Sequence, residues 1–364
     1  MYKKILIIVF FLTSTLSLFP QPYGKGAILD YDIYDKVPQK AATRDITPLP
    51  RSISLKQYTP IPESQGEYGT CAGWATAFAA RTISESVGLK RTDRELTKKN
   101  VFSPVHAYKN VSDNDGRNGA VISYILDYMR DKGAVKRRDE ELSMKFPNIP
   151  ITLFAASERY PIRDYVRLFS NGYDQPGMVS ERVSPVKKSI AAGKPVIIGM
   201  NCPNSFYNAK GVWKPEETPY EKFGGHAMCV IGYDDDMYGG AFEIQNSWGT
   251  GWGNDGYIWI TYSDFAHFVG EAYEMIDNFF AYQKIAEFSG SVEIEMRGSS
   301  ARMEVEFVNE GYYKTKKSHP SGTLFRYLMN CGKPAYVYAF AADASSYTRI
   351  FPAQGFSAVL AIYK

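Results

Sequence analysis

The stretch Gln65-Gly-Glu-Tyr-Gly-Thr-Cys71-Ala-Gly-Trp-Ala-Thr-Ala-Phe78 places one cysteine between a glycine-punctuated loop and a segment rich in alanine and aromatic residues. Apolar residues recur at helical spacing from Trp74 to Val87, which predicts a helix that begins near Thr70 and stops at Gly88. Unpaired backbone N–H groups at a helix N-terminus favour negative charge, so a thiolate at Cys71 would be stabilised there. The stretch therefore predicts a cysteine nucleophile at the start of a buried helix.

Composition narrows the class of protein. The chain has 364 residues, of which 45% are hydrophobic, enough for one large domain and a smaller one. The formal net charge is only +3, with basic residues scattered among acidic ones, so nucleic acid is not expected as a partner. Four cysteines are too few for a disulfide scaffold, and core packing must hold the fold. The sequence favours separately buried thiols at Cys202 and Cys229, and a disulfide between them is the alternative.

The N-terminus indicates export. Residues 1–20 combine a basic start with a short apolar run, as in a secretory signal peptide, and the run is shorter than the roughly 20 residues of a membrane-spanning helix. Cleavage is expected near Gln21, and an uncleaved anchor is the alternative. The expected location is therefore extracytoplasmic: the periplasm, the cell surface or the medium. Residues 21–48 are polar and mixed, which predicts a linker or a short pro-segment.

Within the region 49–280, the pattern of apolar residues changes along the chain. Its first half has helical patterns and its second half has apolar strand patterns, which predicts an α+β fold with two lobes and a cleft between them. Residues 131–180 are rich in loops and give little prediction. Helices are expected at 103–110, 120–129 and 184–192, and strands at 195–200, after His226, at 241–245 and at 257–261.

The last part of the chain, 285–364, predicts a small all-β domain. Residues 291–296 and 301–307 alternate apolar and charged side chains, as half-solvated antiparallel strands do. Further strands are expected at 336–340 and 356–363.

A thiolate nucleophile needs a base, a group that orients the base, and donors for the oxyanion. His226 opens an apolar strand after two glycines, and Asn246 opens the loop after a neighbouring strand. The Asn246 amide oxygen could accept from the imidazole, and Trp248 could shield that hydrogen bond from water. Gln65, six residues before Cys71, could direct its amide N–H at the oxyanion.

Three blocks now resemble the signatures of papain-like (C1 family) cysteine peptidases of the bacterial exported type. They are Gln65-Gly-x-x-Gly-Thr-Cys71, Gly225-His226-Ala, and Asn246-Ser-Trp-Gly-Thr-Gly-Trp-Gly-x-x-Gly-Tyr257. The resemblance implies a helical lobe plus an antiparallel β-barrel lobe over about residues 49–280. It also implies that Cys71 is the nucleophile, His226 the general base and acid, Asn246 its orienter and Gln65 an oxyanion donor. No metal or organic cofactor is implied.

The resemblance also implies how a peptide substrate binds. Asn118-Gly119 is similar to the family's substrate-binding turn, whose glycine backbone would pair with the peptide. Gly199 and Ala227 fall where the family lines its S2 pocket, which would make that pocket roomy.

The sequence departs from the family at three places. Tyr68 stands where the family has a cysteine, so that disulfide is absent, and Ala72-Gly73 replaces the tryptophan that follows the nucleophile. A glycine in a first turn costs roughly 1 kcal/mol of helix preference, and oxyanion geometry could differ. The chain before Leu49 is too short for the family's long pro-domain, so control by a folded propeptide is not expected.

Other candidate sites are interpreted as structural. The remaining histidines lack a partner motif, Cys229 is expected to be a core thiol, and a strand rather than a helix follows the glycines of 249–253, which argues against a phosphate loop. An EF-hand reading of 113–119 fails because Arg117 occupies a ligand position, so a turn is expected. The structural set is His106, His267, His319, the 113–119 turn and the Asp234–Asp236 hairpin turn, the last with metal binding as the weaker alternative.

The sequence thus predicts an exported cysteine peptidase that hydrolyses peptide bonds through an acyl-enzyme on Cys71. The alternatives are a catalytically inactive papain-like protein that binds peptides or the cell envelope, and an acyltransferase or transpeptidase. The 285–364 domain is expected to contact envelope polymers or a partner protein. The substrate, the cleavage preference, endo- or exo-action and the oligomeric state do not follow from the sequence.

Overall fold

The computed structural model describes residues 23–41, 48–113, 115–170 and 178–277, and in the C-terminal region 290–299, 301–309, 312–320, 322–331, 339–342 and 347–351. The predicted signal peptide at 1–20 and the strand expected at 356–363 lie outside these residues. Within the described part, no helix has both the length and the apolar character needed to cross a membrane.

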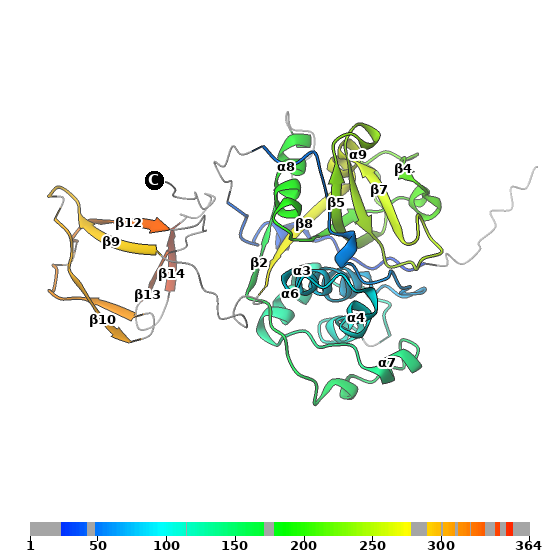
Figure 1. Ribbon diagram of the computed structural model, residues 1–364, viewed down its shortest axis with the longest axis horizontal. Helices are drawn as coiled ribbons and strands as arrows, with labels where there is room; N and C mark the ends of the chain where they lie inside the picture. Colours follow the sequence, from blue (N-terminus) through cyan, green and yellow to red (C-terminus); the bar gives the residue numbers. More distant parts are fainter. Residues whose placement is uncertain are drawn as a thin grey trace, which may run out of the picture.

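Two lobes make up residues 49–277, one mainly of helices and the other built on a sheet (Figure 1). The predicted α+β, papain-like architecture is confirmed. The helices and short helical turns are α1 (Tyr31–Tyr34), η1 (Lys56–Tyr58), α2 (Cys71–Gly73), η2 (Trp74–Arg81), α3 (Thr82–Gly88), α4 (Arg94–Lys99), α5 (Pro104–Lys109), α6 (Ile122–Asp131), α7 (Asp139–Ser143), η3 (Ile151–Phe154), α8 (Met178–Ala191), η4 (Asn204–Asn208), η5 (Met237–Gly239) and α9 (Tyr262–Phe268).

The sheet has the strand order β2-β8-β3-β5-β6-β7-β4, with β1 also pairing with β5. Every pairing is antiparallel except that of β4 with β7. The ten-residue β5 has three partner strands, which places it at the centre. The strands are β1 (Ser52–Ser54), β2 (Asp164–Arg167), β3 (Val196–Asn201), β4 (Val212–Trp213), β5 (Gly225–Asp234), β6 (Ala241–Gln245), β7 (Tyr257–Thr261) and β8 (Val269–Ile276).

One helical run, from Cys71 to Gly88, passes through the core between the lobes. It consists of α2, the π-helical η2 and α3, and it matches the predicted helix within a residue at each end. Its buried positions are mostly small, including Ala72, Ala77 and Ala80, each at 0% exposure. Small side chains let the run be enclosed on several sides at once, against β5, α5 and α6.

Helix α5 crosses this run at Gly73. Ser103 caps α5 by accepting from the His106 N–H at 3.0 Å, and Pro104 takes the first helical position, as predicted. A Cβ on Gly73 would lie 2.4 Å from the Pro104 carbonyl oxygen, closer than any side chain tolerates. Glycine therefore stands at position 73 because α5 packs directly on the backbone there.

The helix expected at 184–192 differs in extent from the observed one, and the turn expected at Asp234–Asp236 is present. Helix α8 starts at Met178 rather than at 184, so Pro185, expected near the helix start, lies inside the helix, where it has no N–H to donate. The turn expected at Asp234–Asp236 joins β5 to η5 and β6, and the Asp234 carboxylate caps it by accepting from the Asp236 N–H at 2.8 Å.

The C-terminal region contains the antiparallel pairs β9 with β12, β10 with β11, and β13 with β14. The expected strands at 291–296 and 301–307 correspond to β9 and, in part, β10, and the one expected at 336–340 overlaps β13. Their bounds are β9 (Gly290–Met296), β10 (Val305–Asn309), β11 (Tyr312–Thr315), β12 (Phe325–Cys331), β13 (Ala339–Ala342) and β14 (Tyr347–Phe351).

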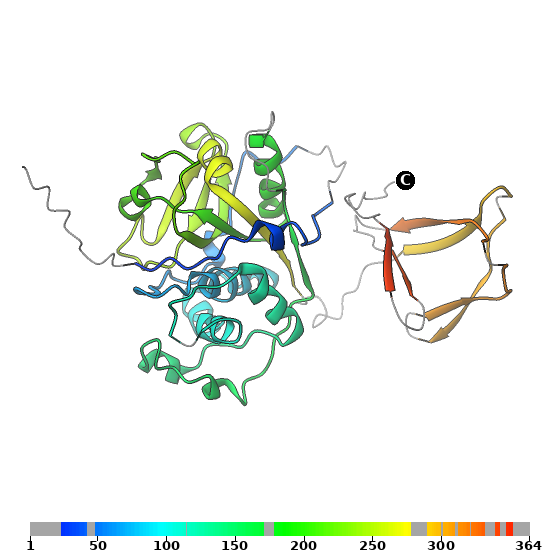
Figure 2. The same ribbon diagram turned by 180° about the vertical axis from the view of Figure 1, so that it is seen from behind.

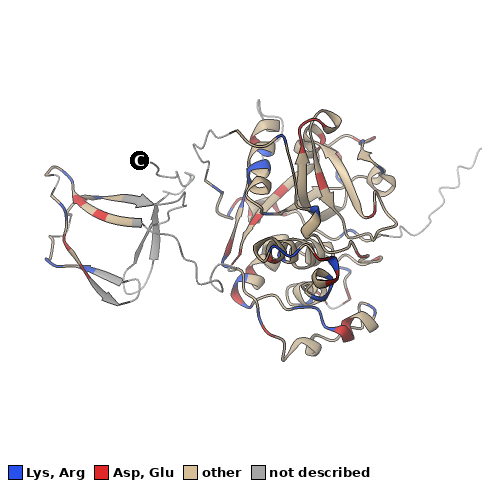
Figure 3. Cartoon of the chain, viewed as in Figure 1, with Lys and Arg blue, Asp and Glu red and all other residues tan. Residues whose placement is uncertain are grey.

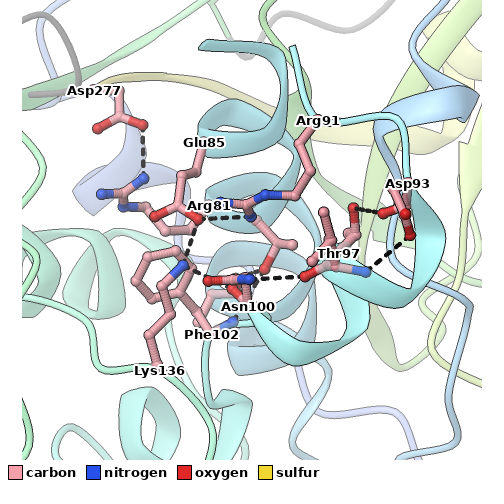
Figure 4. Close-up of polar contacts among 12 residues, drawn as sticks. Arg81, Glu85, Arg91, Asp93, Thr97, Asn100, Phe102, Lys136 and Asp277 are labelled. Carbon is pink, nitrogen blue, oxygen red and sulfur yellow. Dashed lines mark hydrogen bonds and ion pairs between the residues drawn. The ribbon is translucent and has the colours of Figure 1, made fainter. Parts of the chain in front are cut away.

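A buried ion pair fastens the central helix to the end of β8. The Arg81 guanidinium donates to the Asp277 carboxylate at 2.7 Å, and the two side chains are only 4% and 9% exposed (Figure 4). Beside it, Glu85 accepts from Arg91 at 3.0 Å and from Lys136. Arg81 and Lys136 both lie over the Phe102 ring, and burial lowers the pKa of Lys136 to about 8.

Replacing Asp277 by alanine is expected to lower the free energy of unfolding by about 3–5 kcal/mol, because Arg81 then keeps a buried charge without its partner. Urea denaturation measures this loss. Asp236→Ala is the matched control, since the Arg51–Asp236 pair is 72% and 65% exposed, and it should leave the transition midpoint unchanged. Equal small effects in both variants would show that the Arg81–Asp277 pair does not anchor the helix.

Candidate active site

Cys71 is the first residue of the central helix and is fully buried, at 0% exposure. Its sulfur accepts from the Ala227 N–H at 3.4 Å. The N–H groups of Gly26 and Ala27, which donate to the Gly225 carbonyl, and the N–H of Ala72 lie close enough to lower the pKa of the thiol. A ring of backbone donors around the sulfur is the environment predicted for a stabilised thiolate, but two of these donors come from the segment before residue 30.

The predicted base and its predicted orienter meet at one end of the sheet. His226 is near the start of β5 and Asn246 directly follows β6, and because these strands are antiparallel the two positions lie side by side. His226 Nε2 lies 2.7 Å from Asn246 Oδ1, which also accepts from the Ser247 N–H at 2.7 Å. An amide oxygen requires a donor, so Nε2 carries the proton and Nδ1 keeps a lone pair.

Trp248 shields this hydrogen bond from solvent. Its ring stacks on the His226 ring with centroids 4.6 Å apart and is 1% exposed. Tyr207 and Tyr23 also stack on Trp248, at 5.0 and 5.1 Å. The predicted supporting role of Trp248 agrees with this geometry, because exclusion of water strengthens the His226–Asn246 bond.

Gln65 is held with its amide pointing at a backbone carbonyl. Its Oε1 accepts from the Ser247 hydroxyl at 2.5 Å, which leaves Nε2 to donate to the Tyr68 carbonyl at 2.7 Å and to the Gly24 carbonyl at 3.1 Å. The Gly24 carbonyl also accepts from Trp248 Nε1 at 3.2 Å. The amide expected to bind an oxyanion is thus already engaged by a carbonyl of the N-terminal segment.

Residues 23–29, called the plug here, lie between the two lobes and are held by backbone hydrogen bonds (Figure 2). On one side, the Gly24 N–H donates to the Gly66 carbonyl at 2.9 Å and the Ala120 N–H donates to the Gly26 carbonyl at 2.8 Å. On the other, the Gly26 and Ala27 N–H groups donate to the Gly225 carbonyl at 3.1 and 3.0 Å. The plug thus lies against the site, where Cys71 is fully buried.

The fit of the plug requires glycine at two positions. A Cβ on Gly24 would lie 2.1 Å from the Tyr68 carbonyl oxygen, and one on Gly26 would lie 2.1 Å from the Gly69 carbonyl oxygen. The alternation Tyr23-Gly-Lys-Gly26 was the signal in the sequence that could have found the plug. No folded pro-domain stands before residue 49 among the described residues, but a short covering segment does.

The predicted substrate-binding residues lie around the plug with one exception. Asn118 is exposed and its N–H donates to Asp113, away from the plug. Gly119 touches the plug, since a Cβ there would be 2.3 Å from the Gly26 carbonyl oxygen, but the backbone pairing is made by Ala120. Sequence reasoning missed Ala120.

The Gly199 and Ala227 pair sits beside the pocket that Leu29 fills. These two residues face each other between β3 and β5, and a Cβ on Gly199 would lie 2.7 Å from Leu29 Cδ2 and 3.2 Å from Ile122. Glu271, paired with Gly199 on β8, is also at this position and was not predicted. The absence of a side chain at residue 199 makes the space that Leu29 occupies.

Burial sets the protonation of the catalytic pair in this covered form. It raises the pKa of the Cys71 thiol to about 11, against a partial lowering by the surrounding backbone N–H groups. It lowers the pKa of His226 to about 3, although the Asn246 hydrogen bond acts in the opposite direction. Burial therefore shifts the pKa of each side chain in the direction that favours its neutral form.

Three of the other candidates, Cys202, Cys229 and His106, are buried. Cys202 and Cys229 are buried free thiols, and no disulfide joins them. His106 packs against Tyr128 and Phe154, and its burial lowers its pKa to about 4. Across the described part of the chain, no three His, Cys, Asp or Glu side chains gather as a metal ion would require.

Tyr68, at the position of the missing cysteine, packs edge-on against Phe146 at 4.8 Å and thereby fixes the loop before Cys71 by aromatic packing. The site as a whole has a buried thiol at a helix start, in contact with the N–H of Ala227, and the preceding residue, His226, is bound to the Asn246 amide. A second amide, that of Gln65, is directed at backbone carbonyls. This arrangement defines a thiol-dependent acyl-transfer or hydrolytic centre.

Comparison with known proteins gives the family. Residues 49–274 match the papain family of cysteine proteases, and the chain belongs to that family. It is 26% identical over 205 residues to a cathepsin L-like peptidase of Aedes aegypti, covering 55% of this chain and 54% of that one. It is also 26% identical over 216 residues to cathepsin K of Mus musculus, covering 57% and 59%. The chain spans a little over half the length of these curated relatives.

Solved structures show the same fold. Xylellain, a cysteine protease from Xylella fastidiosa, superposes with a TM-score of 0.54 at 23% identity, over 71% of this chain and 97% of that one. Digestive procathepsin L 3 of the Tenebrio molitor larval midgut gives 0.52 at 16% identity, over 70% and 76%.

Displacing the plug is expected to expose Cys71. In the full-length chain at pH 7 the thiol should react slowly with iodoacetamide, whereas Gly26→Val, which collides with the Gly69 carbonyl, should raise the rate by roughly tenfold or more. Peptide mass mapping of carboxamidomethyl Cys71 follows the reaction. Gly251→Val is the control, because that position faces open space. Fast labelling of Cys71 in the unsubstituted chain would contradict the covered site.

Proposed function

We propose that this protein is an exported cysteine peptidase that hydrolyses peptide bonds through an acyl-enzyme on Cys71. The observation that carries the proposal is the His226 Nε2 to Asn246 Oδ1 contact of 2.7 Å beside a thiol at a helix start. It supports the sequence-based assignment of Cys71, His226 and Asn246 as nucleophile, base and orienter. The full activity is proposed on this geometry together with family membership.

The proposed mechanism begins once the plug has left. His226 Nδ1, whose lone pair is available because Nε2 donates to Asn246, takes the proton of Cys71. The thiolate attacks the substrate carbonyl, and the oxyanion is stabilised by Gln65 Nε2 and the backbone N–H of Cys71. Protonated His226 then donates to the leaving amine, and water hydrolyses the thioester by the same base in reverse order.

The chain is proposed to consist of a signal peptide at 1–20, a short pro-segment within 21–48, the peptidase domain at 49–280 and a β domain at 285–364. The partner is a peptide or protein substrate, with Gly119, Gly199 and Ala227 proposed to line its path and Asn118 at its edge. No cofactor takes part in the proposed steps. Basic and acidic positions are interspersed over the described elements (Figure 3), in keeping with a substrate chosen by shape rather than by net charge.

The second candidate is a catalytically inactive protein that binds peptides or envelope polymers. The observation that favours it is the plug itself, because backbone hydrogen bonds hold this segment against the residues around Cys71. An inactive binder would retain peptides with the plug displaced and release no new amino termini, whereas a peptidase would release them. A transpeptidase would instead ligate added amines faster than water.

Gln65→Ala is expected to lower kcat for peptide hydrolysis by about 10²–10³-fold with a smaller change in KM, because an oxyanion donor acts mainly in the transition state. A fluorogenic peptide assay on plug-displaced protein measures it. Gln245→Ala removes a second buried glutamine amide, whose Nε2 donates to the Pro60 carbonyl at 3.2 Å and not to the carbonyls that Gln65 contacts. That control should cost stability but leave kcat intact, and equal losses in both would refute the assignment of Gln65.

Removal of residues 285–364 is expected to release the protein from the cell envelope and to leave peptide hydrolysis unchanged, since all the proposed catalytic residues precede residue 280. Cell fractionation and the peptide assay test the two parts separately. An unchanged location would reject the proposed contact of the β domain with envelope polymers or a partner.

A further inference from the structure

Lys25 of the plug is a half-buried cation that lies close to the nucleophile. The pKa of the Cys71 thiol is raised by burial and lowered in part by the N–H of Gly26, so the residue next to Lys25 lies close to the sulfur. The Lys25 ammonium donates to the Cys202 carbonyl oxygen at 2.6 Å and lies 4.4 Å from the centroid of the Tyr207 ring. The plug thus places a basic side chain against the sheet lobe beside Cys71.

The surroundings of Lys25, called the cation subsite here, are formed by Cys202, Tyr207, Glu217 and Gly224. The aliphatic stem of Lys25 packs on Gly224, where an added Cβ would lie 3.3 Å from Lys25 Cδ. A lysine side chain requires an acceptor for its ammonium and cover for its methylene groups, and an aromatic face adds a cation–π contact. The cation subsite offers all three.

Glu217 supplies the negative charge of the cation subsite. Its Oε1 accepts from the Ser205 N–H at 2.8 Å, and its Oε2 accepts from the Ser205 hydroxyl at 2.6 Å. The Ser205 hydroxyl oxygen in turn accepts from Trp213 Nε1 at 3.1 Å, which fixes its position. Burial lowers the pKa of Lys25, and Glu217 is among the groups that act in the opposite direction. The carboxylate is therefore held where it favours a charged ammonium in the subsite.

Tyr207 is fixed by contacts that do not involve the plug. Its ring stacks on Trp248 with centroids 5.0 Å apart, and its carbonyl accepts from Trp252 Nε1 at 3.0 Å. The contacts of Glu217 with Ser205 also lie outside the plug. The shape of the cation subsite therefore does not depend on Lys25, and another basic side chain can take its place.

The position of His226 indicates which substrate residue reaches the cation subsite. Burial lowers the pKa of His226 and the Lys25 ammonium adds to this effect, so the cation lies near the imidazole. In the proposed mechanism the imidazole protonates the leaving amine, so the residue after the scissile bond lies on this side of Cys71. Leu29, at the other end of the plug, fills the space beside Gly199.

We propose that the cation subsite binds the basic side chain, lysine above all, of the residue that follows the scissile bond, so that the enzyme cuts peptides on the amino side of basic residues. This inference rests on the proposed peptidase function and names its substrate class. The subsite recognises one side chain, not the net charge of the substrate. The bonds made and broken are those of the proposed hydrolysis.

The subsite acts in the first half of the reaction only. The leaving amine carries the basic residue away before water hydrolyses the thioester, so peptides with the same acyl part share one deacylation step. The preference for a basic residue is therefore expected in kcat/KM, which reports on the steps up to acylation, and not in the rate of deacylation.

Peptides that differ only after the scissile bond provide the first test. Internally quenched fluorogenic peptides with lysine, norleucine or glutamate at that position are given to full-length Gly26→Val protein, and mass spectrometry checks the bond that is cut. The lysine peptide is expected to exceed the norleucine peptide in kcat/KM by roughly tenfold or more, because it gains a charge-assisted hydrogen bond and a cation–π contact. The glutamate peptide should be cut slowest. Equal kcat/KM for lysine and norleucine would overturn the proposal.

Glu217→Gln tests the charge of the subsite. It is expected to lower the ratio of kcat/KM for lysine over norleucine by roughly threefold or more, because the attraction between the two charges is lost. Glu216→Gln is the matched control, since it removes the same charge from an exposed neighbouring side chain and should leave the ratio unchanged. Equal reductions in both variants would refute the subsite in favour of a general effect of net charge.

A further test needs no peptidase activity, because Lys25 is itself a ligand of the subsite. In the full-length chain, Lys25→Met is expected to raise the rate at which iodoacetamide labels Cys71 by roughly tenfold, and Lys25→Arg by much less. Glu217→Gln should raise the rate when Lys25 is present and add nothing when it is methionine, as for two groups in one interaction. Labelling that Lys25→Met leaves unchanged, or that Glu217→Gln raises equally in both backgrounds, would refute the subsite.

The tests separate the subsite from the proposed function. If Gly26→Val protein cuts no peptide while Lys25 and Glu217 are coupled in the labelling experiment, the cation subsite stands and the peptidase is rejected. If all three peptides are cut equally and Lys25→Met does not change the labelling, the peptidase stands and the cation subsite is rejected.

Discussion

The antiparallel register of β5 and β6 is the constraint on which the site depends. It brings His226, near the start of one strand, beside Asn246, just after the end of the other, and so permits the 2.7 Å contact that fixes the imidazole. Ser247 and Trp248 follow Asn246 directly. The same strand pairing therefore also places the Trp248 ring, which stacks on His226, and the Ser247 hydroxyl, which donates to Gln65. One strand pairing and one loop therefore bring His226 and Gln65, which are distant in sequence, to the consecutive residues 246–248.

The central helix supplies the remaining half of the site. Its small buried residues let the sheet and α5 approach closely, and Gly73 allows the Pro104 carbonyl to touch its backbone. The replacement of tryptophan by Ala72-Gly73 thus reflects the close packing of α5. The ion pair of Arg81 with Asp277 fixes the other end of this helical stretch to β8.

Much of the fold and of the candidate site could be predicted from the sequence, because the patterns that indicate them are local. The helix at Cys71, the strands around His226 and Asn246 and the two-lobed fold follow from periodicity and from three motifs in order. The plug was not predicted, because residues 21–48 have no periodicity and their fit depends on contacts with Gly66, Ala120 and Gly225, distant in sequence. Ala120 was missed for a related reason, since backbone pairing leaves no mark on side-chain identity. Glu271 was missed because an acidic residue in an apolar strand signals nothing until its partner, the Asp30 N–H, is located.

The pKa values of Cys71 and His226 depend on how deeply the two side chains are buried. Burial raises the pKa of Cys71 and lowers the pKa of His226, and the plug contributes to the burial of the site. The most direct measurement of the central claim is reaction of plug-displaced protein with a peptidyl epoxide, followed by mass mapping of the adduct. The account predicts a single thioether on Cys71 that His226→Ala abolishes in a chain that remains folded. Folded, plug-displaced protein that forms no adduct on Cys71 would contradict it.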